Sequence, residues 1–291
     1  MRVQEHMNTQ ENIPADWRAW ISSNQARGCS KESMLDSMLK AGLNAAVASA
    51  WLASMAGKDA GAPVATVPAD MPYRYEASRI AAGNALVVAG VTVRIALRLA
   101  EPDIVVIDDL LSAAECEELI AQSQQKLKPS TIIDPDTGAA RPIDARSSEG
   151  AFFQRAETAL VQRLEQRISA LMNWPAEYGE GLQVLHYRSG GEYKPHFDYF
   201  PLEKTGSAIH LAKGGQRVST LILYLNEVEQ GGETTFPQVG LSVTPRRGTA
   251  VYFSYCNSLG QIDPATLHGG APVLAGEKWI ATKWMRQQRY G

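Results

Sequence analysis

Three residues in the C-terminal half of the chain have the types and spacing of a metal site: His196, Asp198 and His268. In an extended strand, residues i and i+2 point to the same face, so the imidazole of His196 and the carboxylate of Asp198 can converge on one point. His268 follows in a second strand-and-turn region and would add a third ligand. These residues therefore predict a metal centre held by two nitrogen donors and one oxygen donor.

A His-x-Asp spacing alone is weak, because a partly buried histidine paired with an aspartate is a common structural arrangement. Lys278 strengthens the metal interpretation, since it lies on the strand expected after His268. A buried cation is costly unless an anion neutralises it. A surface lysine at a strand end is the alternative. Two histidines and one carboxylate with open positions form the site of non-heme Fe(II) oxygenases, which leaves room for a chelating cosubstrate and O2.

The elements that must position these residues are mainly strands. Ser112 and Glu115 form a capping box that opens a helix to about Lys126, and a second helix is expected from Gln154 to about Asn173. The remaining pattern is β-branched or aromatic with Gly-rich turns, which predicts a helix-flanked barrel or sandwich. The expected strands cover residues 86–88, 92–98, 103–107, 183–187, 218–225, 250–253 and 279–284.

The first 70 residues differ from the rest of the chain. Three short helical patterns lie between residues 14 and 57, and their apolar residues include Trp17, Trp20 and Trp51. Residues 57–72 are rich in Gly, Ala and Pro, which is typical of a linker. We therefore expect a helical module with its linker at 1–70 and a catalytic domain at 71–291. Substrate recruitment, a stabilising cap on the barrel and a homodimer interface are the open alternatives for the module.

The composition argues against several classes of protein. The chain is 45% apolar and 20% charged, as in ordinary globular proteins. Its net charge is −3 and it has no basic block, so we expect no nucleic-acid partner. It shows neither a signal-peptide pattern nor the roughly 20 apolar residues that span a bilayer. Its three cysteines are widely spaced, which suits reduced intracellular thiols. We expect a cytoplasmic protein with no membrane segment.

The motifs resemble one known family, the prolyl 4-hydroxylase branch of the 2-oxoglutarate dioxygenases. The resemblance covers a core at about 102–289, and three separated segments carry it in the family's order: residues 183–198 (QVLHY to HFD), 231–237 (GGETTFP) and 267–284 (LHGG to the final Trp). Ala271 stands where the family often has Cys, and Ser147 where Thr is commoner. The excursion at 202–215 is longer than expected, which leaves the substrate open.

The resemblance implies a mainly β fold with flanking helices, in which a double-stranded β-helix (jelly-roll) catalytic core follows the small N-terminal helical module. It also implies Fe(II) at His196, Asp198 and His268. Lys278 would receive the distal carboxylate of 2-oxoglutarate, and Tyr187 would add a hydroxyl hydrogen bond to this cosubstrate. The substrate-side residues by this resemblance are Tyr193, Arg217, Trp284, Arg146 and Ser148.

Four of these assignments, those of Tyr187, Tyr193, Trp284 and Arg217, have structural alternatives. The aromatic residues could be core side chains, and Arg217 could lie on a solvated strand face. Two histidines outside the triad, His186 and His210, are expected to be structural and solvated, respectively.

The activity that the resemblance implies is that of an oxidoreductase similar to procollagen-proline dioxygenase. It would hydroxylate a peptide or protein residue, with 4-hydroxylation of proline as the leading expectation. It would use Fe(II), 2-oxoglutarate and O2, with ascorbate as a further cofactor, and release succinate and CO2. The alternatives are a hydroxylase of a free amino acid or of another peptide residue, a non-catalytic peptide-binding barrel, and a cupin-like metal hydrolase or isomerase. The intact ligand set with Lys278 favours the dioxygenase.

Overall fold

The structure, a computed structural model, describes residues 17, 20, 21, 24, 31–41, 43–55, 71–130, 132–133, 140–141, 147–202, 204 and 206–291. The chain divides into two compact units, Met1–Met71 and Pro72–Gly291. Each unit has a hydrophobic core of its own.

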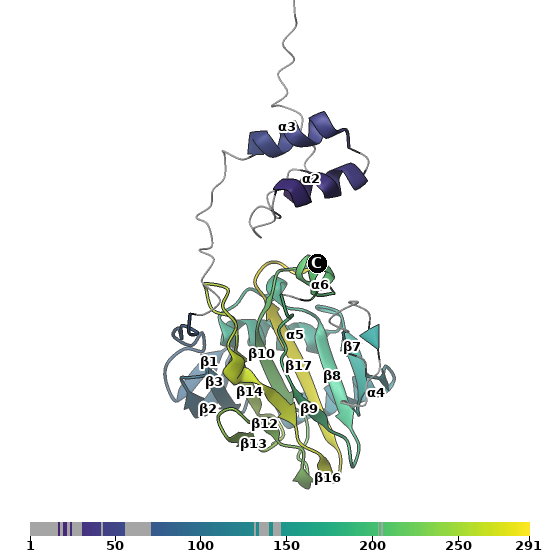
Figure 1. The fold of residues 1–291 in the computed structure, drawn as a ribbon. Helices are drawn as coiled ribbons and strands as arrows, with labels where there is room; N and C mark the ends of the chain where they lie inside the picture. The colour runs from purple at the N-terminus through teal and green to yellow at the C-terminus, as the bar shows by residue number, and fades with distance from the viewer. Residues whose placement is uncertain are drawn as a thin grey trace, which may run out of the picture. The chain divides into compact units, whose positions relative to one another are not determined.

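The N-terminal unit contains helices α2 (Lys31–Lys40) and α3 (Ala45–Met55), which pack on each other (Figure 1). Its core buries Ile21, Met34 and Met38 together with residues of α3. The rings of Trp17 and Trp20 pack edge to face at 5.4 Å. Two of the three expected helical patterns are thus described as helices. Residues 57–70 of the expected linker lie outside the described residues.

The second unit is built from antiparallel sheets. A nine-stranded sheet has the order β1-β2-β3-β14-β10-β17-β8-β7-β4, and a four-stranded sheet has the order β13-β12-β15-β9. Side chains from both, such as Leu221 of β10 and Phe236 of β12, belong to one hydrophobic core. The result is the expected jelly roll (Figure 1).

The bounds of the strands in the large sheet are β1 Ala85–Val88, β2 Val91–Leu99, β3 Ile104–Asp108, β4 Lys128–Pro129, β7 Glu149–Phe153, β8 Leu182–Tyr187, β10 Arg217–Tyr224, β14 Ala250–Ser254 and β17 Lys278–Arg286. The smaller sheet contains β9 Tyr193–His196, β12 Thr234–Phe236, β13 Leu241–Val243 and β15 His268–Gly270. Two short pairs are β5 Ile132–Ile133 with β6 Ala140–Arg141, and β11 Gln230–Gly231 with β16 Val273–Ala275.

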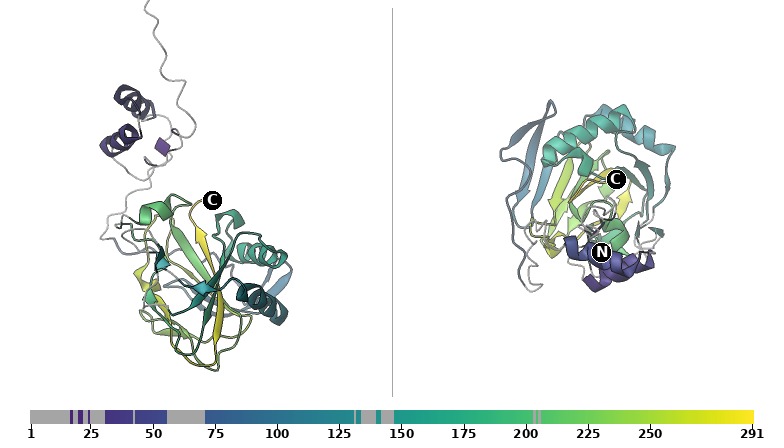
Figure 2. Two further views of the ribbon diagram at one scale, coloured as in Figure 1. Left: turned by 90° about the vertical axis from the view of Figure 1, so that its right-hand side faces the viewer. Right: turned by 90° about the horizontal axis from the view of Figure 1, so that it is seen from above.

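Helices α4 (Ala113–Gln124) and α5 (Ala159–Met172) lie side by side on the outside of the barrel (Figure 2). The capping box of Ser112 and Glu115 at the start of α4 is present, as predicted. Helix α5 begins later than the expected Gln154. Thr158 has an extended backbone and its hydroxyl accepts a hydrogen bond from Val161 N, so it is the N-cap that fixes the start.

The excursion at 202–215 contains a short helix, α6 (Ser207–Leu211). Here the expectation for His210 was wrong: its ring stacks on Phe200, with centroids 5.2 Å apart, and the side chain is half-buried. Two 3-10 turns, η1 (Ala176–Tyr178) and η2 (Pro264–Thr266), complete the elements. Among the described residues, no helix has the length and apolar character needed to cross a membrane.

Candidate active site

The three predicted ligands come together at one point of the barrel. One donor atom from each of His196, Asp198 and His268 lies within 4.8 Å of the other two. His196 Nε2 is 3.6 Å from Asp198 Oδ1, and His268 Nε2 is 3.5 Å from Asp198 Oδ2. Among the residues that the structure describes, this is the one group of three or more His, Cys, Asp or Glu side chains with such geometry.

The pairing of β9 with β15 creates this convergence. His196 at the end of β9 lies directly opposite His268 at the start of β15. Asp198 lies two residues beyond the end of β9, in a bend, so the strand is shorter than the i, i+2 argument assumed. Gly269 permits the close approach of the two strands, because a Cβ on it would lie 2.9 Å from Tyr193 O.

Backbone carbonyls fix the tautomers of both histidines. His196 Nδ1 is 2.9 Å from Lys194 O, and His268 Nδ1 is 3.0 Å from Thr266 O. A carbonyl oxygen only accepts, so each Nδ1 carries the proton and donates it. Each Nε2 therefore offers its lone pair to the cluster. The hydrogen bond from Nδ1 to a carbonyl is the one that a metal-ligating histidine usually makes with its other ring nitrogen.

The electrostatics keep the donors in their ligating forms. Burial lowers the pKa of His268 to about 4, so its imidazole is neutral at physiological pH. Burial alone would raise the pKa of Asp198, but the nearby His268 and His196 hold it below its usual range. The Asp198 carboxylate also accepts a hydrogen bond of 2.7 Å from the Thr220 hydroxyl. Two imidazole nitrogens and one carboxylate fit Fe(II).

The site is accessible from one side. The side chain of His196 is 20% exposed, whereas those of Asp198 and His268 are 7% and 4% exposed. Phe253 lies against His268, with ring centroids 4.5 Å apart. Access to the three donors is therefore from the side of His196, as an open coordination site requires.

Lys278 is buried, so the surface-lysine alternative is wrong. Its exposed fraction is 3%, and no ion-pair partner within 4.0 Å is found for it among the described residues. Burial lowers its pKa to about 8, while the charge of Glu233 raises it. Such a group favours a bound anion.

Two glycines lie beside the Lys278 side chain. A Cβ on Gly232 would lie 3.3 Å from Lys278 Cδ, and one on Gly270 would lie 3.6 Å from Lys278 Nζ. The ammonium therefore lies beside β15, the strand that carries His268. Tyr187 is directly opposite Lys278 on β8, and its ring centroid is 5.6 Å from Nζ. This arrangement fits the distal carboxylate of 2-oxoglutarate, although the binding roles of Lys278 and Tyr187 stay predictions.

Tyr193 and Arg217 contact two different ligands. The Tyr193 ring stacks on His196, with centroids 3.6 Å apart. Arg217 donates to the backbone oxygen of Asp198 at 3.2 Å. Its guanidinium also lies 3.9 Å from the ring centroid of Trp284. The structure thus places three of the expected substrate-side residues around the triad.

The sequence analysis missed the residue that holds Arg217 in place. Glu180 accepts two hydrogen bonds from Arg217, at 2.7 and 2.9 Å, and one from Arg286 at 2.8 Å. Burial alone would raise the pKa of Glu180, but Arg217 and Arg286 hold it low. Arg217 is therefore a paired, largely buried side chain, which contradicts the solvated-face alternative. The signal was an acidic residue two positions before the first residue of β8.

The structure does not bring the other two predicted substrate-side residues, Arg146 and Ser148, to the triad among the described residues. Arg146 lies outside the described residues. Ser148 is half-buried, and its hydroxyl donates to Ser130 Oγ at 2.9 Å. No contact of Ser148 with the triad is found among the described residues. Its role stays a prediction.

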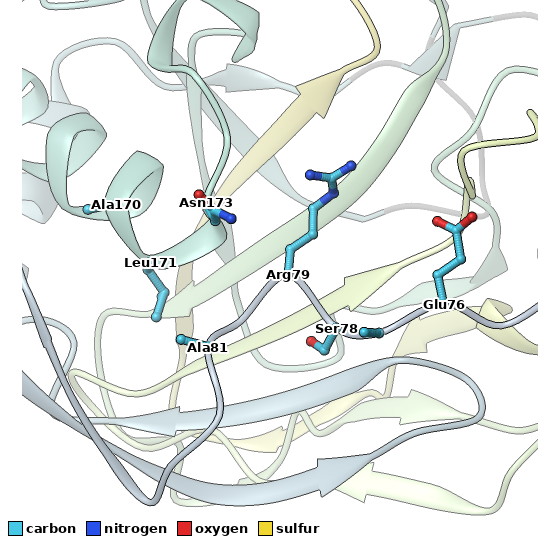
Figure 3. Close-up of a pocket in the computed structure, with 8 residues that line it drawn as sticks. Glu76, Ser78, Arg79, Ala81, Ala170, Leu171 and Asn173 are labelled. Atoms are coloured by element: carbon cyan, nitrogen blue, oxygen red, sulfur yellow. The ribbon is translucent and has the colours of Figure 1, made fainter.

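A separate pocket lies between residues 76–81 and the end of α5 (Figure 3). Its volume is about 620 Å³, and Glu76, Ser78, Arg79 and Asn173 contribute polar atoms to its lining. The Arg79 guanidinium lies 3.7 Å from the ring centroid of Trp174. None of the predicted site residues lines this pocket.

Comparison with known proteins agrees with this geometry. Residues 182–286, which include the triad and Lys278, match the model of the 2OG-Fe(II) oxygenase superfamily. The chain is 39% identical over 209 residues to the probable prolyl 4-hydroxylase 3 of Arabidopsis thaliana, covering 65% of this chain and 71% of the relative. It is 43% identical over 202 residues to prolyl 4-hydroxylase 1 of the same plant, covering 64% and 70%.

A solved structure is similar as well. The viral collagen prolyl hydroxylase of Paramecium Bursaria Chlorella virus-1, crystallised as a 2OG complex, aligns with a TM-score of 0.50 and 29% identity. The alignment covers 63% of this chain and 95% of the viral one. The chain aligns with both plant prolyl 4-hydroxylases at more than 30% identity and over more than two thirds of their length. It therefore belongs to the prolyl 4-hydroxylase family of 2OG-Fe(II) oxygenases.

Proposed function

We propose that the protein hydroxylates prolyl residues of a peptide or protein at C4, converting 2-oxoglutarate and O2 to succinate and CO2. The observation that carries this proposal is the combination of the His196, Asp198 and His268 donors with a buried ammonium, Lys278, beside the strand of His268. A metal site alone would suit many reactions. A metal site with a nearby anion partner suits a chelating dicarboxylate.

The residues of the chain have separate tasks in this reaction. When bound, Fe(II) together with 2-oxoglutarate and O2 supplies the oxidising power that replaces a C–H bond by C–OH. The Nε2 atoms of His196 and His268 and the Asp198 carboxylate would hold the metal. Lys278 would hold the far end of the cosubstrate through a charge-assisted hydrogen bond. The protein thereby fixes the orientation of reactants and excludes water.

The aromatic side chains around the triad support a prolyl substrate. Tyr193 covers one face of His196. Trp284 on β17 lies opposite Thr220 on β10, and Thr220 contacts Asp198. Flat aromatic faces offer apolar contact to a pyrrolidine ring. The names of the relatives, two plant prolyl 4-hydroxylases and a viral collagen prolyl hydroxylase, support the same substrate class.

Tandem mass spectrometry of proline-rich peptides tests the proposal. With Fe(II), 2-oxoglutarate and O2, we expect a mass gain of about 16 Da, the mass of one oxygen atom, on proline and an equal amount of succinate. The matched control is the His196→Ala protein, which should give neither product. Succinate without any hydroxylated peptide across a broad peptide set would contradict the peptide assignment.

A hydroxylase of a free amino acid is the second candidate. The 20% exposure of His196 leaves a narrow approach, which a small substrate could also use. The same assay with free proline and other amino acids separates the two candidates. Hydroxylation of a free amino acid with no product on peptides would favour this second function.

Three further properties belong to the proposal. Ascorbate would keep the iron ferrous, and turnover with and without it checks this role. A cytoplasmic location is supported by Cys116 and Cys256, which are both buried and unpaired, and fractionation of cells would test it together with the absence of membrane attachment. A homodimer through the N-terminal helices would appear as twice the monomer mass of 31.7 kDa in light scattering.

A further inference from the structure

Thr220 and Tyr255 form a buried hydrogen-bonded chain that ends on a metal ligand. Thr220 Oγ1 lies 2.7 Å from Asp198 Oδ2 and 3.1 Å from the Tyr255 hydroxyl. Thr220 is 0% exposed and Tyr255 is 1% exposed, so water does not compete for these groups. Neither residue belongs to the predicted ligand set.

The direction of the two hydrogen bonds follows from counting protons. Asp198 is an ionised carboxylate and can only accept, so Thr220 must donate its single hydroxyl proton to Asp198. Tyr255 must then donate to the free lone pair of Thr220 Oγ1. Burial raises the pKa of Tyr255 well above its ordinary value, which keeps this donor protonated. Successive hydrogen bonds of this kind polarise and strengthen one another.

A bulge in β10 lies between the two residues of this strand that contact Asp198. The register of β10 against β17 shifts between Arg217 and Ser219, which inserts one extra residue. Arg217 and Thr220 are three positions apart, yet both bond to Asp198. Arg217 binds its backbone oxygen and Thr220 its carboxylate. The bend that carries Asp198 is therefore held at two points by one strand.

We propose that Thr220, supported by Tyr255, is a positioning residue that sets the orientation of the Asp198 carboxylate for the metal. This inference rests on the proposed role of the triad as a metal centre. Asp198 lies beyond the end of β9, so no strand pairing of β9 holds its backbone. The Thr220 hydroxyl restricts rotation of the carboxylate and keeps its oxygens directed at the two Nε2 atoms. The β-branched Thr220 side chain is itself stiff about χ1.

Metal affinity of the full chain tests the inference without relying on turnover. Binding of Mn(II) by isothermal titration calorimetry is compared for wild type and for the Thr220→Val, Thr220→Ser and Tyr255→Phe variants. Loss of a hydrogen-bond partner of a metal ligand lowers affinity by roughly 10- to 100-fold, which we expect for Thr220→Val. Thr220→Ser keeps the hydroxyl and should bind metal close to the wild-type affinity. Tyr255→Phe should weaken binding by about fivefold, the effect of one neutral hydrogen bond.

Two matched controls remove similar groups elsewhere. Thr249→Val deletes a hydroxyl that donates to Arg246 O at 2.7 Å. Tyr252→Phe deletes a buried phenol of β14 at a position that pairs with Leu221 and not with Thr220. Both should leave metal affinity unchanged. Because Tyr255 acts through Thr220, adding Tyr255→Phe to Thr220→Val should cause no further loss.

The outcomes distinguish this inference from the proposed function. If wild type binds no Mn(II), the metal centre and the inference both fail. If wild type binds and Thr220→Val and Tyr255→Phe bind equally well, the inference alone fails. If Thr220→Val does not fold, as judged by thermal melting, Tyr255→Phe decides, and unchanged affinity in that variant overturns the inference.

Discussion

His196 and His268 are direct cross-strand partners, His196 on β9 and His268 on β15, and their ring centroids are 4.4 Å apart. Opposite residues in an antiparallel pair have their Cβ atoms only about 5 Å apart, so strand pairing alone brings two imidazoles within reach of one ion. The metal site therefore depends on the closeness of these two strands as much as on the ligands.

Substitution of Gly269 tests this dependence. A Cβ at this position would lie 2.9 Å from Tyr193 O and 3.1 Å from Pro195 N, so Gly269→Ala must separate β9 from β15. We expect weaker Mn(II) binding and a lower melting temperature. The control is the neighbouring Gly270→Ala, whose new Cβ would have no contact shorter than 3.6 Å and should keep metal affinity. Equal Mn(II) affinities for the two variants would refute the explanation.

Removal of any one metal ligand should abolish turnover. His196→Ala, Asp198→Ala and His268→Ala each delete a donor of the triad, so succinate formation should fall by more than the roughly 10- to 100-fold cost of an outer partner. Circular dichroism should show an intact fold. His210→Ala serves as the control, because this histidine stacks on Phe200 outside the triad. Activity retained in any ligand variant would remove that residue from the metal site.

Lys278 should strengthen the binding of 2-oxoglutarate but lower the stability of the ligand-free protein. Lys278→Ala should strongly raise the apparent KM for 2-oxoglutarate, and Lys278→Arg should restore it only in part, because the guanidinium has a different shape. Lys278→Met removes a buried charge and should stabilise the ligand-free protein, by on the order of 1 to 3 kcal/mol. An unchanged KM in the Ala variant would place Lys278 outside the cosubstrate pocket, and urea denaturation measures the stability change.

The affinity for 2-oxoglutarate should decrease at alkaline pH. Burial lowers the pKa of Lys278 to about 8, so the side chain is charged below pH 8 and becomes neutral above it. The neutral amine no longer attracts the distal carboxylate, and the KM for 2-oxoglutarate should rise as pH increases past about 8. Bound cosubstrate favours the charged form, so the transition in kcat should occur at higher pH. A KM that stays flat from pH 7 to pH 10 would contradict this role.

The same pKa shift has a consequence for folding. Between pH 8 and the ordinary lysine value of 10.5, the unfolded chain binds more protons at this residue than the folded chain does. The contribution of Lys278 to the stability of the ligand-free protein should therefore become more favourable as pH rises through this window. The Lys278→Met variant should lack this component of the pH dependence.

Removal of the N-terminal unit should spare the chemistry. The cut belongs before Pro72, because Arg74 and Tyr75 bond to Gln261 and Asp263 of the catalytic unit. We expect fragment 72–291 to retain uncoupled succinate production and to bind a full-length protein substrate more weakly. A lower melting temperature with normal chemistry would instead favour a stabilising cap, and loss of all turnover would contradict a separable module.

The sequence by itself determined the features that depend on local pattern. The types and order of His196, Asp198 and His268 were readable, because ligand chemistry is a property of single residues. The β-branched and aromatic runs at 218–225 and 279–284 and the capping box of Ser112 were also readable, because strand propensity and helix capping depend on single residues or on neighbours a few positions apart.

Only the tertiary structure decided how far these side chains are buried and which residues they contact. Only the pairing of β9 with β15 brought His268 beside His196, and only the sheet order buried Lys278 opposite Tyr187. In the sequence, Thr220 is one hydroxyl residue in an apolar strand, and only the structure shows that it donates a hydrogen bond to Asp198. Such contacts join residues tens of positions apart, and their energies depend on burial and geometry that no local pattern carries.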